Sequence, residues 1–250
     1  MRNVLKAETL ERKFPLLAVE HGCIVSKDAD LTVAFEVLLP EIYTVTGDEY
    51  EAIHSAWVKA IRVLPDYSVV CKQDWFVEET YRPDFDRDGQ SFLAESYERH
   101  FNERPYLGHR CYLYLTKTTR ERSRRRSDFS TLCRGHILPR EIADRDTAAR
   151  FLEAVEQFER IMNDSGKVSL RRMPPEEITG TSERPGLVER YFSLSADDRS
   201  AVLEDICLEP GRMRIGDKQL CLHTLSAADD LPGRVETDMR YGRLSTDRSD

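Results

Sequence analysis

The run Leu31-Thr-Val-Ala-Phe-Glu-Val-Leu38 is rich in β-branched and apolar residues, which favour a β-strand. A second run of this kind, Gly22-Cys-Ile-Val-Ser26, precedes it, and the polar segment Lys27-Asp-Ala-Asp30 separates the two. Two short strand-forming runs joined by a few polar residues are typical of a β-hairpin. We therefore expect an antiparallel hairpin near the start of the chain.

A helix is predicted directly after this hairpin. Thr46-Gly-Asp-Glu49 has the form of a capping box, in which the threonine side chain accepts the glutamate amide and the glutamate carboxylate accepts the threonine amide. Apolar residues recur at helical spacing behind it, until Pro65 ends the pattern. These residues are Tyr50, Ile53, Trp57, Ala60, Ile61 and Leu64.

Two more segments have helical periodicity. A helix is expected from about Ser91 to Asn102, and its apolar side chains lie on one side: Phe92, Leu93, Tyr97 and Phe101. Thr147 to Met162 has the most regular stripe, formed by Ala148, Phe151, Leu152, Val155, Phe158 and Met162. Both patterns predict helices with one apolar face.

Extended segments alternate with these helices. They are expected at Tyr67–Thr80, Gly108–Thr118 and Val168–Arg172, followed by a short helix over Leu187–Leu194 and hairpin strands between Ile206 and Leu225. Hairpins interspersed with long helices predict an α+β fold, with a mostly antiparallel sheet and helices packed on one face. The predicted domain spans residues 1–228, with a division into two subdomains near 120–145 left open, and residues 229–250 form a polar linker.

The composition is that of a polar globular protein. Of the 250 residues, 40% are hydrophobic and 33% charged, and the formal net charge of −8 argues against a general polyanion-binding surface. The sequence has no run of 18 apolar residues that would predict a membrane span, and its first ten residues lack the apolar segment of a signal peptide. A cytoplasmic protein is expected.

The cysteines and histidines predict no metal or redox site. None of the six cysteines forms a C-x-x-C pair, and the six histidines show no clustered spacing. Four cysteines lie in apolar runs and are expected to be buried free thiols: Cys23, Cys71, Cys111 and Cys221. Cys207 and Cys221 are candidates to face each other across the predicted hairpin, although a disulfide is not expected in a reducing compartment.

The segment Gly211-Arg-Met-Arg-Ile-Gly216-Asp217-Lys218 is close to a phosphate-binding P-loop but departs from it at the decisive positions. Asp217 takes the place of the phosphate-binding lysine, and its carboxylate would repel phosphate. A P-loop also joins a strand to a helix, whereas Arg212–Ile215 and Gln219–Leu225 are predicted strands. Gly216-Asp217 is therefore interpreted as a hairpin turn.

The order of these elements resembles the N-terminal region of type IV secretion and conjugation ATPases, and more closely the TraG family of conjugative-transposon ATPases. The residues that carry the resemblance are the hairpin Gly22–Phe35, the strand Ser68–Trp75, the turn segment Arg99–Leu107, the strand Cys111–Thr119, Phe129–Cys133, and Ile215-Gly-Asp217 through Leu231-Pro232. Such proteins have an N-terminal α+β domain followed by a motor domain that binds ATP and Mg²⁺. The chain contains neither Walker motif, so the resemblance implies no catalytic residue, cofactor or enzymatic activity here.

The resemblance implies a non-catalytic domain that docks the motor to inner-membrane channel subunits, or to other protomers, during conjugative DNA transfer. The protein would then be cytoplasmic and peripheral at the inner membrane through its partners. Self-association is a further expectation.

An alternative function is nucleic-acid binding through a basic segment. Its candidate contacts to phosphate or to an acidic partner are Lys117, Arg120, Arg122, Arg124, Arg125 and Arg126. The run contains no aromatic residue for base stacking, and a solvated loop is the favoured interpretation of it.

A calcium loop is a second local candidate. The segment from Asp84 to Glu95 matches the spacing D-x-D-x-D-G-x5-E, in which Asp84, Asp86, Asp88 and Glu95 would supply carboxylates. Position 9 is Phe92, which offers no side-chain oxygen, and a strand rather than a helix is predicted before the loop. An acidic loop at the start of a helix is the competing interpretation.

The remaining polar and aromatic residues are expected to be structural. Neighbouring carboxylates occur at Glu78-Glu79, Glu176-Glu177, Asp197-Asp198 and Asp229-Asp230. Adjacent strand residues point to opposite faces, so such pairs are poor acid–base candidates. Four aromatic residues are assigned to the core: Tyr50, Trp57, Trp75 and Phe158.

Overall fold

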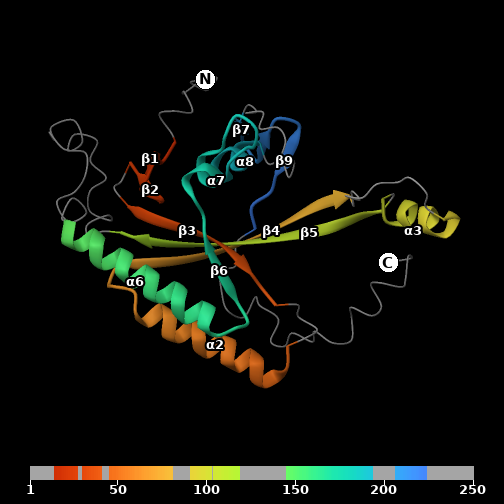
Figure 1. The fold of residues 1–250 in the computed structure, drawn as a ribbon. Coiled ribbons are helices and arrows are strands. Elements are labelled where there is room, and N and C mark those ends of the chain that lie inside the picture. Colours follow the sequence, from red (N-terminus) through yellow and green to blue (C-terminus); the bar gives the residue numbers. More distant parts are fainter. Residues whose placement is uncertain are drawn as a thin grey trace, which may run out of the picture.

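The computed structural model describes residues 14–27, 30–40, 45–80, 91–102, 104–118, 145–193 and 206–223. Its centre is a six-stranded sheet with the order β1-β2-β3-β5-β4, in which β6 also pairs with β3 (Figure 1). The strands are β1 (Leu16–Glu20), β2 (Cys23–Ser26), β3 (Leu31–Leu38), β4 (Ser68–Thr80), β5 (Pro105–Lys117) and β6 (Ser169–Arg172). Neighbouring strands of this sheet are antiparallel, which confirms the predicted α+β fold.

The hairpin expected near the start of the chain is present as β2 and β3, with Ile24 opposite Thr32. The structure adds β1, which the sequence analysis did not predict. The turn between β1 and β2 is His21-Gly22, with φ of 53° and 71°. Positive φ at both central residues is the requirement of a type I′ turn, whose twist matches that of antiparallel strands.

Two long helices, α2 (Gly47–Arg62) and α6 (Arg145–Asp164), pack on one face of the sheet (Figure 1). The capping box before α2 is confirmed: Glu49 N donates to Thr46 Oγ1 over 3.3 Å, and Thr46 N donates to Glu49 Oε2 over 2.9 Å. The side chains that form this core include Val33, Phe35, Val37, Leu113, Leu115, Phe151, Val155, Phe158 and Met162. The predicted stripe of α6 is thus the face that the sheet buries.

Two short helices, α7 (Pro175–Thr179) and α8 (Leu187–Ser193), lie against the opposite face of the sheet. Alternate residues of the strands supply this second cluster, because successive strand side chains point to opposite faces. Its buried residues are Ile24, Ala34, Tyr112, Met173, Ile178 and Leu187. Both faces of the central strands β3 and β5 are therefore covered, whereas the sequence predicted helices on one face only.

The segment between α7 and α8 approaches itself so closely that it requires glycine. A Cβ atom added to Gly186 would lie 2.1 Å from the backbone nitrogen of Gly180, well inside van der Waals contact. A single antiparallel bridge joins Gly180 to Pro185 in the same loop. This contact sets the path by which α8 returns to the sheet.

A separate three-stranded sheet contains β7 (Ile206–Glu209), β8 (Arg212–Ile215) and β9 (Lys218–Leu220). Gly216, with φ of 57°, and Asp217 form the turn between β8 and β9. The P-loop-like segment is therefore a hairpin, as predicted, although β9 ends at Leu220 rather than Leu225. Because β8 lies between the other two strands, Cys207 of β7 and Cys221 do not face each other, and both are free thiols.

Two groups of residues depart from the predicted burial. Tyr50, assigned to the core, is 70% exposed; it lies in the first turn of α2 and is not among the side chains that pack against the core. Cys23 and Cys111 are buried as expected, but Cys71 and Cys221 are exposed. An apolar sequence neighbourhood did not guarantee burial, since Cys71 lies on the outermost strand and Cys221 follows β9.

Candidate interaction surface

Lys117 is the member of the predicted basic set that falls within the described residues. Its ammonium group donates to the main-chain carbonyl of Asp66 and lies 5.5 Å from the centre of the Tyr67 ring. Thr118 N also donates to Tyr67 O over 3.0 Å. These contacts hold the end of β5 against the residues before β4, so Lys117 has a structural role at this strand end.

The other predicted site residues lie largely outside the described part of the chain. This applies to Arg120, Arg122, Arg124, Arg125 and Arg126, and to Asp84, Asp86 and Asp88. Glu95 lies in α3 (Phe92–Asn102), where Ser91 Oγ accepts a hydrogen bond from Ala94 N over 3.3 Å. Within the described ranges, no cluster of three or more His, Cys, Asp or Glu side chains is arranged to hold a metal ion.

The pairing of β4 with β5 brings together a polar cluster that sequence reasoning missed. Asp74 Oδ1 lies 2.9 Å from His109 Nε2, and the Lys72 ammonium also contacts the Asp74 carboxylate. The Phe76 ring stacks on the His109 ring, with the ring centres 4.6 Å apart and an angle of 9° between the ring planes. Residues this far apart in sequence become neighbours through the register that places Asp74 opposite Cys111. In the sequence alone, the available signal for this cluster was the alternation of side chains within each strand.

This cluster does not have the properties of a catalytic cysteine site. Burial raises the pKa of Cys111 to about 11, so its thiol remains protonated at neutral pH and is a poor nucleophile. In a catalytic triad, the carboxylate contacts the side of the imidazole that faces away from the thiol. Here the Asp74 carboxylate contacts both the thiol and His109, so it does not have this orienting role. The arrangement is better suited to fixing charges along β4.

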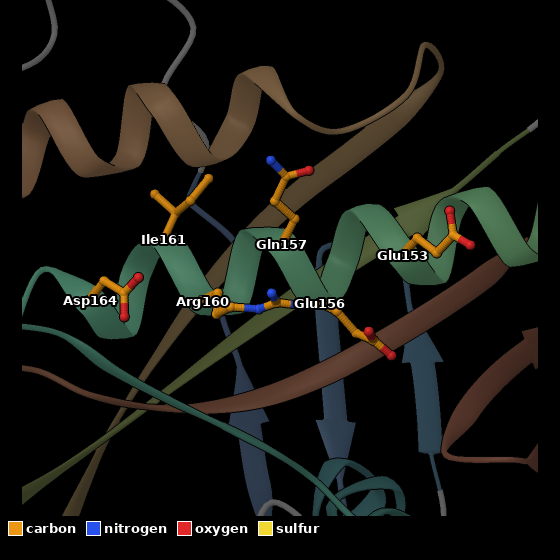
Figure 2. A pocket seen from close by; sticks show the side chains of 6 residues that line it. All are labelled: Glu153, Glu156, Gln157, Arg160, Ile161 and Asp164. Carbon is orange, nitrogen blue, oxygen red and sulfur yellow. The ribbon is translucent and has the colours of Figure 1, made fainter.

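A surface hollow of about 380 Å³ lies along α6, and Figure 2 shows the side chains that line it. They are Glu153, Glu156, Gln157, Arg160, Ile161 and Asp164. All six come from the same helix, and the charged ones are those expected on its solvated side. The hollow brings no groups from separate elements together and does not define a ligand site.

The most distinctive surface lies where β4 and β5 extend beyond the rest of the sheet. β3 pairs with β5 only from Cys111 to Lys117, so the preceding part of β5 pairs with β4 alone. This two-stranded ribbon, residues 76–80 and 105–109, leads to α3 at its far end (Figure 1). We call the ribbon and α3 together the arm.

The arm carries large apolar side chains that are exposed to solvent. On α3, Phe92 is 79% exposed, Leu93 77% and Tyr97 67%. At about 100° per residue, these three side chains fall within an arc of about 140° on the helix. Phe76 and Leu107 add exposed apolar surface on the ribbon. The predicted apolar side of this helix thus exists, but the described fold does not bury it.

No described helix is long and apolar enough to cross a membrane.

The comparisons with known proteins identify one partial match. The family described as "Domain of unknown function, B. Theta Gene description (DUF3875)" matches residues 3–55 of the chain. No curated protein matches the sequence. The matched segment contains β1, β2, β3 and the start of α2, and it does not include the arm.

Proposed function

We propose that this chain is a non-catalytic docking domain and that the arm is its contact surface for another protein. The observation that carries the proposal is the exposure of Phe92, Leu93 and Tyr97 on one side of α3. A contiguous apolar patch on a protruding element is typical of a protein interaction site. An amphipathic helix commonly binds by placing such a face into an apolar groove of the partner.

The energetics of the patch agree with this role. An isolated helix of 11 residues is marginally stable in water, so α3 gains from contacts with other protein surface. Full burial of one large apolar side chain contributes about 1.5–3 kcal/mol. Three such side chains would supply on the order of 5–9 kcal/mol before the costs of association are subtracted. Because the cost of association is of the same order, a specific contact also needs apolar or polar contacts beyond these three side chains.

The resemblance to the N-terminal region of TraG-family conjugation ATPases supports a particular partner. In this proposal the arm binds a channel subunit at the inner membrane and thereby positions an ATPase motor during conjugative DNA transfer. The domain itself is cytoplasmic and reaches the membrane through that partner. ATP hydrolysis belongs to the motor and not to this chain.

The test is co-purification of the chain with each channel subunit encoded by the same conjugation system. Leu93→Asp places a charge in the centre of the α3 patch and is expected to lower complex recovery at least about tenfold. Leu222→Asp is the matched control, because Leu222 is 78% exposed but lies after β9, outside the arm. Equal recovery with Leu93→Asp and the unmodified chain would refute the arm as the contact surface.

A further inference from the structure

β4 offers an unusually long strand edge. It pairs over 13 residues with β5, in a continuous register from Ser68 opposite Lys117 to Thr80 opposite Pro105. Among the described residues, β5 is the only strand that pairs with β4, which lies at the end of the sheet order. Natural proteins usually protect such an edge with proline, a bulge, a short strand or charged side chains. β4 has no proline or bulge and is not short, and the charged side chains that it carries are Lys72, Asp74, Glu78 and Glu79.

The charges on β4 are arranged to match a second copy of the same edge. Lys72 and Asp74 lie two residues apart and therefore on the same face of the sheet. When two β4 edges run antiparallel about a two-fold axis at Gln73, Lys72 of each copy lies opposite Asp74 of the other. We propose that β4 pairs in this register with β4 of a second copy, which joins the two central sheets into one.

Neighbouring registers are less favourable. Side chains that lie opposite each other in an antiparallel pair share one face of the sheet. A two-fold axis perpendicular to the sheet therefore allows only β4–β4 registers that differ by two residues. An axis at residue 72 places Lys72 opposite Lys72, and an axis at residue 74 places Asp74 opposite Asp74. Like charges directly opposite each other destabilise an antiparallel pair, whereas opposite charges stabilise it.

The apolar residues agree with the same register. Val70 lies opposite Phe76 of the second copy, and Val69 lies opposite Val77, so each face gains an apolar cross-strand pair. Phe76 is exposed in the single chain, and the partner strand would cover part of its ring. Gln73 lies on the axis, and within its own chain its Oε1 atom accepts a hydrogen bond from Tyr114 Oη over 3.0 Å.

The test uses charge reversal and mixing. Lys72→Asp leaves carboxylates at both positions 72 and 74, and Asp74→Lys leaves ammonium groups at both. Sedimentation velocity of the unmodified chain is expected to show a concentration-dependent dimer. Each single variant creates two like-charge contacts per dimer and is expected to weaken self-association about tenfold or more.

The mixture gives the decisive result. An equimolar mixture of the two variants places unlike charges at both contacts, so it is expected to form heterodimers with an affinity within about threefold of the unmodified chain. If a substitution weakened self-association only by disturbing its own chain, mixing would not restore it, because each variant keeps two like charges within its own β4 strand. Native mass spectrometry identifies the heterodimer by mass.

Further controls separate this inference from the proposed function. Leu93→Asp, on the arm helix, is expected to leave dimerisation unchanged, and circular dichroism verifies that each variant is folded. A chain that stays monomeric at its highest soluble concentration overturns the inference. Dimers that do not respond to charge reversal, or a mixture that fails to recover, also overturn it. If a strand of an unrelated protein pairs with this edge instead, the purified chain stays monomeric, and this result also overturns the inference.

Discussion

Replacing Phe158 with alanine is predicted to destabilise the fold by about 3–5 kcal/mol. The Phe158 side chain is fully buried between α6 and the central sheet. Its ring meets the Trp57 ring of α2 edge-to-face, with centres 6.0 Å apart and an interplanar angle of 68°. The substitution therefore removes a large apolar side chain and an aromatic pair at the point where α2, α6 and the sheet converge.

The expected loss is a large fraction of the 5–15 kcal/mol that is typical of a folded domain. Urea denaturation, followed by tryptophan fluorescence and far-ultraviolet circular dichroism, measures the free energy of unfolding. Tyr50→Ala is the matched control, since Tyr50 is on α2 but largely exposed, and it should change stability by less than about 0.5 kcal/mol. A loss below about 1 kcal/mol for Phe158→Ala, or an equal loss for Tyr50→Ala, would refute the described core.

Four further predictions concern caps, charges, close packing and the basic segment. Thr46→Ala removes the N-cap of α2 and should cost about 1 kcal/mol in urea denaturation, whereas Thr46→Ser should cost much less. The hydrogen bond from Lys167, followed by those from Thr46, lowers the pKa of Glu49 from its ordinary value of 4.5 to about 2. Its stabilising contribution is therefore complete above pH 4.5 and is lost as the pH falls toward 2, and NMR titration of the carboxyl carbon should show the low midpoint. Gly186→Ala forces a Cβ atom against rigid backbone and should lower stability by about 1–3 kcal/mol, and an unchanged midpoint would contradict the close approach. If docking to protein is the function, alanine substitution of the arginines within residues 117–126 should leave any weak single-strand DNA binding unchanged in a salt titration, and a large, salt-dependent loss would favour the nucleic-acid alternative.

The elements that the sequence predicts best are those with strong local signals. The capping box at Thr46 fixed the start of α2, and the stripe from Phe151 to Met162 identified the buried face of α6. Gly216-Asp217 placed the turn of a hairpin because few other residues suit that backbone. In each case, residues within a few positions of one another in the sequence carry the signal.

The features that escaped prediction depend on contacts between distant parts of the chain. β1 is short, and its turn at His21-Gly22 is a weaker signal than Asn-Gly or Asp-Gly. The neighbourhood of Asp74 and His109 requires the register of β4 on β5. Exposure of α3 could not be predicted, since an apolar helix face has the same pattern whether its own sheet or another protein covers it.

The most direct test of the proposed docking surface is photo-crosslinking from the arm in cells that carry a conjugation system. Benzoylphenylalanine introduced at position 97 replaces the exposed Tyr97 side chain with a photoreactive one, and position 222 serves as the control. Mass spectrometry of the adducts should identify a channel subunit cross-linked from position 97 and not from position 222. An absence of adducts from position 97, or the same adducts at equal yield from both positions, would contradict the assignment of the arm as the docking surface.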